Sequence, residues 1–304
     1  MKILITGATG FIGRHLGAFY REQGAEVVAL SRNPHHAQQM LGEGIRTLAW
    51  DGRRVGEWGK VVAEVDAIIH LAGENVAARY WTKGFKQRIR DSRVHSAAAM
   101  AEAIRRASPR PRVFLQASAT GFYGHRGEEE LDEMAPVGEG FLAGVVRQWE
   151  AVTAPVDEMG VRRVVTRFGV VLGRKMGMLG KLELPFRLFL GGYPGDGRQW
   201  LSWIHIADVV QGIDFLLRKE AAEGVYNFTT PHPVRMKTFC RELAKVLHRP
   251  CWAPQPEFLL KLIFREMARE MLLVSQKVYP RRLMEEGFSF RFPRLSEALR
   301  DLLG

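Results

Sequence analysis

At 304 residues, the chain has room for one large α/β domain or for a core domain with a smaller appendage. Its 46% hydrophobic and 25% charged residues are typical of a globular protein and argue against extensive disorder. The formal net charge of +11 raises the question of nucleic acid, but the basic residues are spread along the chain without a recognition helix or an RNA-binding signature.

Short apolar runs alternate with amphipathic stretches over the first two thirds of the chain. This alternation is typical of a parallel sheet with helices on both faces. We expect strands at residues 2–6, 26–30, 47–50, 67–71, 113–117 and 163–167. We expect helices at residues 11–23, near 35–41, within 84–106 and at 142–158. Right-handed crossovers between such strands produce a doubly wound parallel α/β sheet, the Rossmann arrangement.

Beyond about residue 170 the sequence changes character. Glycine and aromatic residues crowd residues 191–200, which predicts a loop over the carboxyl ends of the strands, where open α/β sheets bind ligands. A helix, a strand and a second helix follow, and the tail from Pro250 is interrupted by prolines and then helical. We therefore expect a core at residues 1–230 with interleaved substrate-side loops, and a small, mainly helical C-terminal cap at residues 231–304.

The first predicted strand runs directly into a glycine loop that opens the first predicted helix. In this setting Gly7 permits a tight turn, Gly10 lets a pyrophosphate approach the backbone, and Gly13 allows close helix packing. The helix N-terminus adds unpaired N–H groups and a partial positive charge. A merely structural turn is the alternative, but the strand–turn–helix position favours dinucleotide binding. The residues that we place at the cofactor are Gly7, Thr9, Gly10, Phe11, Ile12 and Gly13.

The end of the second predicted strand bears on which dinucleotide binds. NAD-preferring proteins place a carboxylate there for the ribose hydroxyls, but this strand ends in Ser31 and Arg32 with no acid in range. Ser31 is suited to donate to a phosphate oxygen, and Arg32 to pair with a 2′-phosphate or to stack on adenine. A surface arginine without a ligand is the alternative. The pattern favours NADP(H).

The fourth predicted strand leads into small residues. Leu71, Ala72 and Gly73 let the backbone pass close beneath the cofactor ribose. A buried glycine with only a packing role is the competing interpretation. The position at the carboxyl end of a strand favours cofactor binding.

Four segments together resemble one protein family: residues 6–13 (TGATGFIG), 70–73 (HLAG), 118–124 (SATGFYG) and 202–208 (SWIHIAD). They resemble the extended short-chain dehydrogenase/reductases of the NAD(P)-dependent epimerase/dehydratase superfamily. More narrowly, residues 71–76, 91–94, 167–173 and the tail at 278–288 resemble an atypical subgroup called the epimerase family, which has a distinctive C-terminal cap. The likeness spans nearly the whole chain and implies a nicotinamide cofactor on a Rossmann fold.

The sequence departs from the superfamily at its usual acid–base pair. Typical members use Tyr-x-x-x-Lys, in which the lysine lowers the pKa of the tyrosine and the tyrosine transfers the proton. A glutamate commonly follows that lysine by four residues, and anchoring on Glu150 puts Val146 at the lysine position and Leu142 at the tyrosine position. Neither side chain transfers a proton. The upstream serine is retained as Ser118, and Arg93 stands in place of the usual asparagine.

Tyr123 and Ser118 are the candidate catalytic residues. Tyr123 follows the fifth predicted strand, on a loop expected to face the nicotinamide. A pocket-lining aromatic without a proton role is the alternative for Tyr123. Ser118 is placed to hydrogen-bond a substrate carbonyl or hydroxyl, or simply to cap the end of the strand.

Three arginines complete the candidate cofactor site. Arg88 and Arg93 lie five residues apart on the long helix, and Arg167 ends the sixth predicted strand. The resemblance implies cofactor contacts at these positions, and guanidinium groups match phosphate geometry. Surface salt bridging with Asp91 or Glu102 is the alternative.

The remaining sequence features argue against a metal site, a membrane helix and a secretion signal. Two cysteines, Cys240 and Cys251, are too few for a disulfide framework and have no histidine cluster nearby. No window holds the roughly 18 apolar residues of a membrane helix, and no signal peptide precedes the glycine loop. We expect a cytoplasmic protein without a metal, a membrane or a nucleic-acid partner.

Two functions follow from this pattern. The first is an NADP(H)-dependent oxidoreductase or epimerase-like enzyme for a small polar, sugar-like substrate. The second, motivated by the missing Tyr/Lys pair, is a non-catalytic NADP(H)-binding protein with a regulatory or redox-sensing role. A basic nucleic-acid binder is a third, weaker interpretation. Extended relatives often pair through two long helices, so the resemblance also implies a homodimer.

Overall fold

A seven-stranded parallel sheet forms the centre of the computed structural model, which describes residues 1–304. Its strand order is β11-β7-β5-β4-β1-β2-β3. The bounds are β1 Lys2–Thr6, β2 Glu26–Ser31, β3 Ile45–Ala49, β4 Ala67–His70, β5 Val113–Ala119, β7 Arg162–Phe168 and β11 Gly224–Phe228. The order reverses direction after β3, as the crossover rules require, and the predicted doubly wound α/β fold is confirmed.

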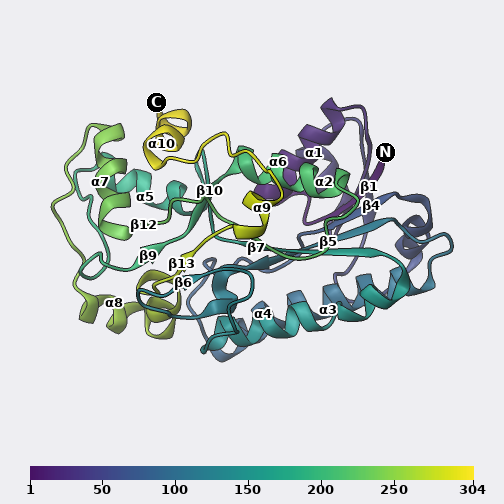
Figure 1. The fold of residues 1–304 in the computed structure, drawn as a ribbon, viewed down its shortest axis with the longest axis horizontal. Coiled ribbons are helices and arrows are strands. Elements are labelled where there is room, and N and C mark those ends of the chain that lie inside the picture. The colour runs from purple at the N-terminus through teal and green to yellow at the C-terminus, as the bar shows by residue number, and fades with distance from the viewer. The chain divides into compact units, whose positions relative to one another are not determined.

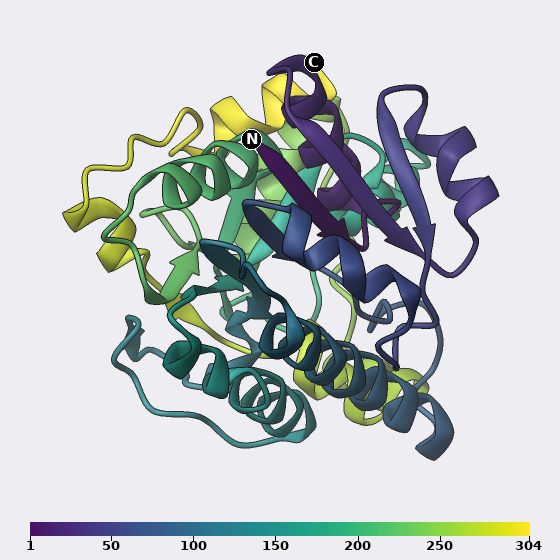
Figure 2. The ribbon, with the colours of Figure 1, turned by 90° about the vertical axis from the view of Figure 1, so that its right-hand side faces the viewer.

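Helices cover both faces of this sheet. Figure 1 shows α1 (Phe11–Glu22) and α2 (Pro34–Leu41) on one side of the N-terminal strands and α3 (Lys83–Arg106) on the other. Figure 2 shows β1, β2 and β3, in purple, side by side, with β3 at the edge of the sheet. With helices on both faces, the central strand β1 is buried, and its Ile3, Leu4 and Ile5 have no exposed surface.

Local sequence explains where the helices begin and end. Asn33 caps α2 by accepting from the amide of His36, and Thr82 caps α3 through the amide of Phe85. The helix expected at 142–158 ends earlier, because α4 covers Phe141–Ala151 and a short 3₁₀ helix follows at Ala154–Met159. Pro155 accounts for the break, since proline lacks the N–H that would continue the helix.

The chain divides into two compact units, each built from separate segments. The first unit comprises Met1–Ser118, Val145–Thr166 and Ile213–Val225, and the second comprises Ala119–Gly144, Arg167–Gly212 and Tyr226–Gly304. Apolar side chains of β1, β2, β4, β5 and α3 form a buried core in the first unit. The expected division between residues 230 and 231 stays a prediction.

The second unit is built from short strand pairs and helices. β8 (Val170–Gly173) pairs with β10 (Trp203–His205), β9 (Trp200–Leu201) with β12 (Val234–Arg235), and β6 (Glu130–Leu131) with β13 (Lys277–Val278). The C-terminal part is mainly helical, as expected. Its helices are α7 Met236–Leu247, α8 Glu257–Phe264, α9 Arg281–Glu285 and α10 Leu295–Leu303, with α5 at Gly177–Arg187 and α6 at Ile206–Arg218 before them. None of the helices combines the length and apolar character that a bilayer crossing requires.

Candidate functional site

The glycine loop folds as a tight turn against the end of β4. Gly7 adopts the left-handed φ of +68°, and a Cβ on it would lie 2.9 Å from the carbonyl of Leu71. The amide of Gly10 donates to the carbonyl of Gly7 at 2.9 Å. A Cβ on Gly13 would lie 2.3 Å from the same carbonyl oxygen. Gly7 and Gly13 are therefore required by packing, as the spacing predicts.

The N-terminus of α1 has no cap of its own. Gly10 occupies the N-cap position without a side chain to offer, and the first turn contains no acidic residue. The first amides of a helix have no intrahelical acceptor. They therefore remain available to an anion, which the helix dipole also favours. Thr9, Phe11 and Ile12 stand half-buried around this end.

The end of β2 carries the two residues that favour NADP(H) in the sequence. The Ser31 hydroxyl donates to the carbonyl of Asn33 at 3.2 Å, so it forms part of the turn into α2. Arg32 is exposed and makes no ion pair with the protein. The end of β2 therefore carries a guanidinium group without an ion-pair partner, and it carries no carboxylate.

The segment after β4 meets Arg93 of α3. A Cβ on Gly73 would lie 3.3 Å from the guanidinium carbon of Arg93, so the guanidinium lies directly against this glycine. Arg93 also donates to the carbonyl of Ile89 at 3.0 Å. Burial lowers the pKa of Arg93 to about 10, while Glu74 opposes that shift, so the side chain stays cationic at neutral pH. Arg88 is exposed on the helix, over the ring of Phe85.

Ser118 contacts a carboxylate at the carboxyl end of β5. Its hydroxyl is almost fully buried and donates to Oε1 of Glu150 on α4 at 2.5 Å. The strand register pairs Thr6 with His70 and His70 with Gln116, so Ser118 lies two residues farther toward the carboxyl edge of the sheet. Glu150 serves only as an alignment anchor in the sequence. It lies 32 residues from Ser118 along the chain, so no local pattern marks it as a partner.

Tyr123 and Arg167 form one buried cluster in the second unit. The Tyr123 hydroxyl donates to Oδ1 of Asn227 at 2.8 Å and accepts from Nη1 of Arg167 at 3.0 Å. The guanidinium carbon of Arg167 lies 3.4 Å from the ring centroid of Phe122. Tyr123 has no exposed surface, and burial raises the pKa of its phenol although Arg167 opposes the shift. The structure thus brings two predicted site residues together.

Asn227 and Glu133 extend this cluster, and the sequence did not reveal them. The backbone N–H of Asn227 donates to Oε1 of Glu133 at 2.9 Å, and its side-chain amide donates to the carbonyl of Tyr279 at 3.0 Å. Burial raises the pKa of the Glu133 carboxyl. Because these partners lie far apart in the chain, no local pattern marks them.

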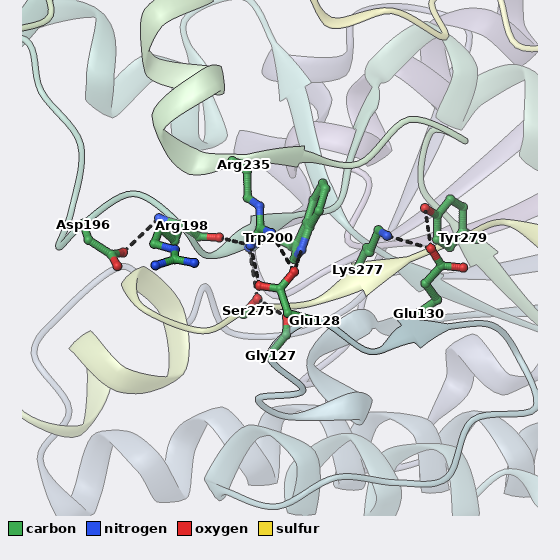
Figure 3. Close-up of polar contacts among 10 residues, drawn as sticks. All are labelled: Gly127, Glu128, Glu130, Asp196, Arg198, Trp200, Arg235, Ser275, Lys277 and Tyr279. Atoms are coloured by element: carbon green, nitrogen blue, oxygen red, sulfur yellow. Dashed lines mark hydrogen bonds and ion pairs between the residues drawn. The ribbon is translucent and has the colours of Figure 1, made fainter.

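An ionic and aromatic cluster surrounds Trp200, at the end of the segment 191–200 that is rich in glycine and aromatic residues. Glu128 accepts from the indole N–H of Trp200 at 2.9 Å and from both terminal nitrogens of Arg235, at 2.7 and 2.6 Å (Figure 3). The guanidinium carbon of Arg235 and the ammonium of Lys277 lie 4.1 and 4.8 Å from the Trp200 ring centroid. Lys277 also pairs with Glu130 at 2.6 Å. The bonds from Arg235 and Trp200 lower the pKa of Glu128 to about 2. Four short segments of the second unit therefore meet at Trp200.

Comparison with known proteins shows the family of this chain. Residues 3–228 match the model of the NAD dependent epimerase/dehydratase family, and residues 255–302 match a domain of unknown function, DUF1731. Epimerase family protein YfhF of Bacillus subtilis is 36% identical over 304 residues, covering all of this chain and 98% of the relative.

Solved structures extend the likeness to the fold. The human epimerase family protein SDR39U1 (isoform 2), crystallised with NADPH, has a TM-score of 0.88 and 34% identity, over 100% of this chain and 99% of that one. UDP-glucuronic acid 4-epimerase from Bacillus cereus, in complex with NAD, shares the fold with a TM-score of 0.79 and 18% identity, over 100% and 96% of the two chains. The chain belongs to the NAD-dependent epimerase/dehydratase family, among its atypical epimerase family proteins.

Proposed function

We propose that the protein binds NADP(H) and uses it in an oxidoreductase or epimerase-like reaction on a small polar, sugar-like substrate. The observation that carries this proposal is the uncapped N-terminus of α1 behind the glycine loop. Backbone amides and a helix dipole suit a pyrophosphate, and the glycines leave the backbone open to it. The residues present therefore fit a dinucleotide.

Arg32 supports the choice of NADP(H) over NAD(H). It is an exposed cation at the end of β2, where an NAD-binding protein would place a carboxylate. The human relative that was crystallised with NADPH supports the same choice. Leu71–Gly73 and Arg93 form the neighbouring wall of the site, with Arg88 farther out on α3.

Binding measurements with the two cofactors test this assignment. Arg32→Ala should weaken NADPH binding about tenfold, because it removes one charge-assisted contact to the 2′-phosphate, and should leave NADH binding unchanged. The control is Arg300→Ala, which removes another exposed arginine. Fluorescence titration measures both affinities. Equal affinity of the wild type for NADPH and NADH would contradict the proposal.

When bound, the cofactor accepts or supplies a hydride. The proton that accompanies the hydride would be handled by Ser118 and Glu150. The carboxylate of Glu150 already accepts the hydrogen of the Ser118 hydroxyl, so it can hold that proton while the serine oxygen faces a substrate hydroxyl or carbonyl. This pair takes the place of the absent Tyr/Lys pair.

Loss of turnover with retained cofactor binding would identify the proton-handling pair. Ser118→Ala and Glu150→Gln should each lower turnover by at least about a hundredfold, as is typical of general acid–base residues. Their affinity for NADPH should match the wild type. The assay follows NADPH oxidation over a panel of carbonyl compounds and nucleotide sugars. Unchanged turnover in both variants would remove the pair from the mechanism.

Tyr123 remains the second candidate for proton transfer. Its hydroxyl is occupied by Asn227 and Arg167, which favours a role in orienting the Arg167 guanidinium. The pH profile of Tyr123→Phe separates the two roles. If Tyr123 transfers the proton, the substitution removes one ionisation from the pH profile of turnover. If Tyr123 only positions Arg167, the substitution lowers turnover equally at every pH.

A non-catalytic role is the second candidate function. The apolar Leu142 and Val146 of α4, which stand where the family has tyrosine and lysine, favour it. A regulatory or redox-sensing protein would bind NADPH tightly and show no substrate-dependent oxidation across the same panel. Robust turnover with any substrate would exclude it.

Two further expectations concern the protein in the cell. Its free thiols, Cys240 and Cys251, suit the reducing cytoplasm. The family resemblance suggests a homodimer. Subcellular fractionation tests the compartment, and light scattering of the purified protein tests the oligomeric state.

A further inference from the structure

A buried histidine connects β1 to α3 beneath the glycine loop. His70 is the last residue of β4 and has no exposed surface. Its Nδ1 lies 2.9 Å from the hydroxyl oxygen of Thr6, and its Nε2 lies 3.2 Å from that of Ser96. Both ring nitrogens therefore have a partner. The further hydrogen bonds of Thr6 and Ser96, at the two ends of this series of hydrogen bonds, decide which nitrogen carries the hydrogen.

The first end is fixed by two backbone amides. Leu71 and Ala72 each donate an N–H to the Thr6 hydroxyl oxygen, both at 3.1 Å, and the Leu71 amide is shared with the backbone carbonyl of Thr6 at 3.2 Å. A hydroxyl has two lone pairs and one hydrogen, so these amides use both of its acceptor sites. The hydrogen of Thr6 is left to donate, and Nδ1 of His70 is its partner. Nδ1 is therefore an acceptor and carries no hydrogen.

The second end is fixed by a carbonyl. The Ser96 hydroxyl lies 3.2 Å from the carbonyl oxygen of Arg93, one turn earlier on α3, which only accepts. Ser96 therefore donates there and accepts from Nε2–H of His70. A neutral ring with its hydrogen on Nε2 satisfies every contact in the chain. A charged ring would set an N–H against the donating hydroxyl of Thr6.

The segments joined by this series of hydrogen bonds are those that form the proposed cofactor site. A Cβ on Gly7 would lie 2.9 Å from the carbonyl of Leu71, whose amide Thr6 holds. A Cβ on Gly73 would lie 3.3 Å from the guanidinium carbon of Arg93, whose carbonyl accepts from Ser96. The glycine loop, the end of β4 and one turn of α3 are thus held by one series of hydrogen bonds.

We propose that His70 is a positioning residue, which in its neutral form with hydrogen on Nε2 fixes the glycine loop relative to Gly73 and Arg93 for cofactor binding. The proposal rests on the proposed function, because NADP(H) is the ligand that this geometry would serve. His70 is fully buried, so it acts through these segments and not by touching the cofactor.

Nitrogen-15 NMR of the full-length protein without cofactor tests the protonation state. We expect His70 to show a hydrogen on Nε2 and none on Nδ1, unchanged between about pH 8 and about pH 5, because burial holds its pKa near 3. A hydrogen on Nδ1, or a charged ring in this range, would overturn the proposal.

Cofactor affinity tests the positioning role. Thr6→Val keeps the shape of the side chain but removes the hydroxyl, and should weaken NADPH binding about tenfold, whereas Thr6→Ser should stay within about twofold of the wild type. The matched control is Thr166→Val, since Thr166 is also fully buried on a strand and donates to the carbonyl of Gln116. Equal affinity of Thr6→Val and Thr166→Val would overturn the proposal.

Amide hydrogen exchange separates this proposal from the proposed function. Without cofactor, Thr6→Val should exchange the amides of Leu71 and Ala72 faster than the wild type, and Thr166→Val should not. If Thr6→Val does not fold, Ser96→Ala, which removes the acceptor of Nε2–H, serves for the exchange and binding measurements. Wild-type protein that fails to bind NADPH would end the proposed function. In that case, the NMR result for the His70 tautomer and the amide exchange rates of Leu71 and Ala72 would decide whether the positioning proposal fails.

Discussion

At the scale of single residues, burial divides the polar groups of the first unit into two kinds. Thr6, His70 and Ser96 are fully enclosed and satisfy one another, so they hold backbone segments in place. Arg32 is exposed and makes no ion pair, so its charge is available to a ligand. Ser118 differs from both kinds, because it is buried but its hydroxyl donates to the carboxylate of Glu150. Burial and hydrogen bonding thus differ among the residues proposed for cofactor affinity, positioning and proton handling.

Acid should destabilise the protein through His70. Burial alone lowers the pKa of His70 from 6.5 to about 3, so between these values the unfolded chain binds a proton that the folded chain excludes. The free energy of unfolding is therefore not reduced by His70 above about pH 6.5, and it falls as the pH drops from about 6.5 toward 3. The slope approaches about 1.4 kcal/mol per pH unit.

Urea unfolding at about pH 7.5 and about pH 5 measures this effect. His70→Gln has no titrating ring, so the wild type should lose about 2 kcal/mol more than the variant between the two conditions. The control is His36→Gln, which replaces an exposed histidine of α2 and should follow the wild type. Parallel losses in the wild type and His70→Gln would show that His70 accepts a proton in the folded state.

Single-residue chemistry was predictable only where the sequence places partners close together. The glycine loop is such a case, because strand, turn and helix follow one another within 22 residues. Arg93 stays a predicted cofactor residue, and its contact with Gly73 could not be foreseen from the sequence. Glu150 and Asn227 were missed as partners, since Ser118 lies 32 residues from the first and Tyr123 104 residues from the second.

At the scale of elements, long-range contacts decide helix ends that local sequence leaves open. α4 begins at Phe141, after Gly140 with φ +109°, and no Ser, Thr, Asp or Asn precedes it. Its first two amides instead donate to the carboxylate of Glu270, at 2.6 and 2.7 Å. The sequence predicted the existence of this helix, but its cap comes from a residue more than a hundred positions away. Strands and helices were thus predictable from periodicity, whereas the cap was not.

Removing the carboxylate of Glu270 should loosen the start of α4. Glu270→Ala leaves the amides of Phe141 and Leu142 without an acceptor and removes a negative charge from the helix N-terminus, at a cost of about 1 kcal/mol in the free energy of unfolding. Chemical denaturation measures the loss. Glu220→Ala, which removes an exposed glutamate in the turn after α6, should change stability by less than about 0.5 kcal/mol. Equal stability of the two variants would show that Glu270 does not cap α4.

At the scale of the whole molecule, the second unit is assembled from segments that lie far apart in the chain. Ser202 accepts from the amide of Val278 at 2.8 Å and donates to the carbonyl of Gln276 at 2.8 Å. Asp208 accepts from the amides of Arg291 and Phe292 at 2.6 and 3.0 Å. Periodicity along the sequence predicted a helical tail but not these bonds, because hydrophobic patterns do not specify which distant segments pair. Ser202 and Asp208 therefore depend on residues after 226 for their hydrogen bonds.

A fragment that ends at residue 230 should consequently fail to form the second unit. In residues 1–230, Ser202 and Asp208 lose their partners, and the buried Leu131 of β6 loses the strand β13 with Val278 that packs against it. Buried polar groups without partners are costly, and exposed apolar surface favours aggregation or a loosely packed state. We expect the fragment to bind a hydrophobic dye and to lack the cooperative thermal transition of the full chain. Co-expression with residues 231–304 should restore the transition, since the missing partners return without the covalent link. A cooperative, dye-free fragment 1–230 would show instead that the core is complete at residue 230, as the sequence alone suggests.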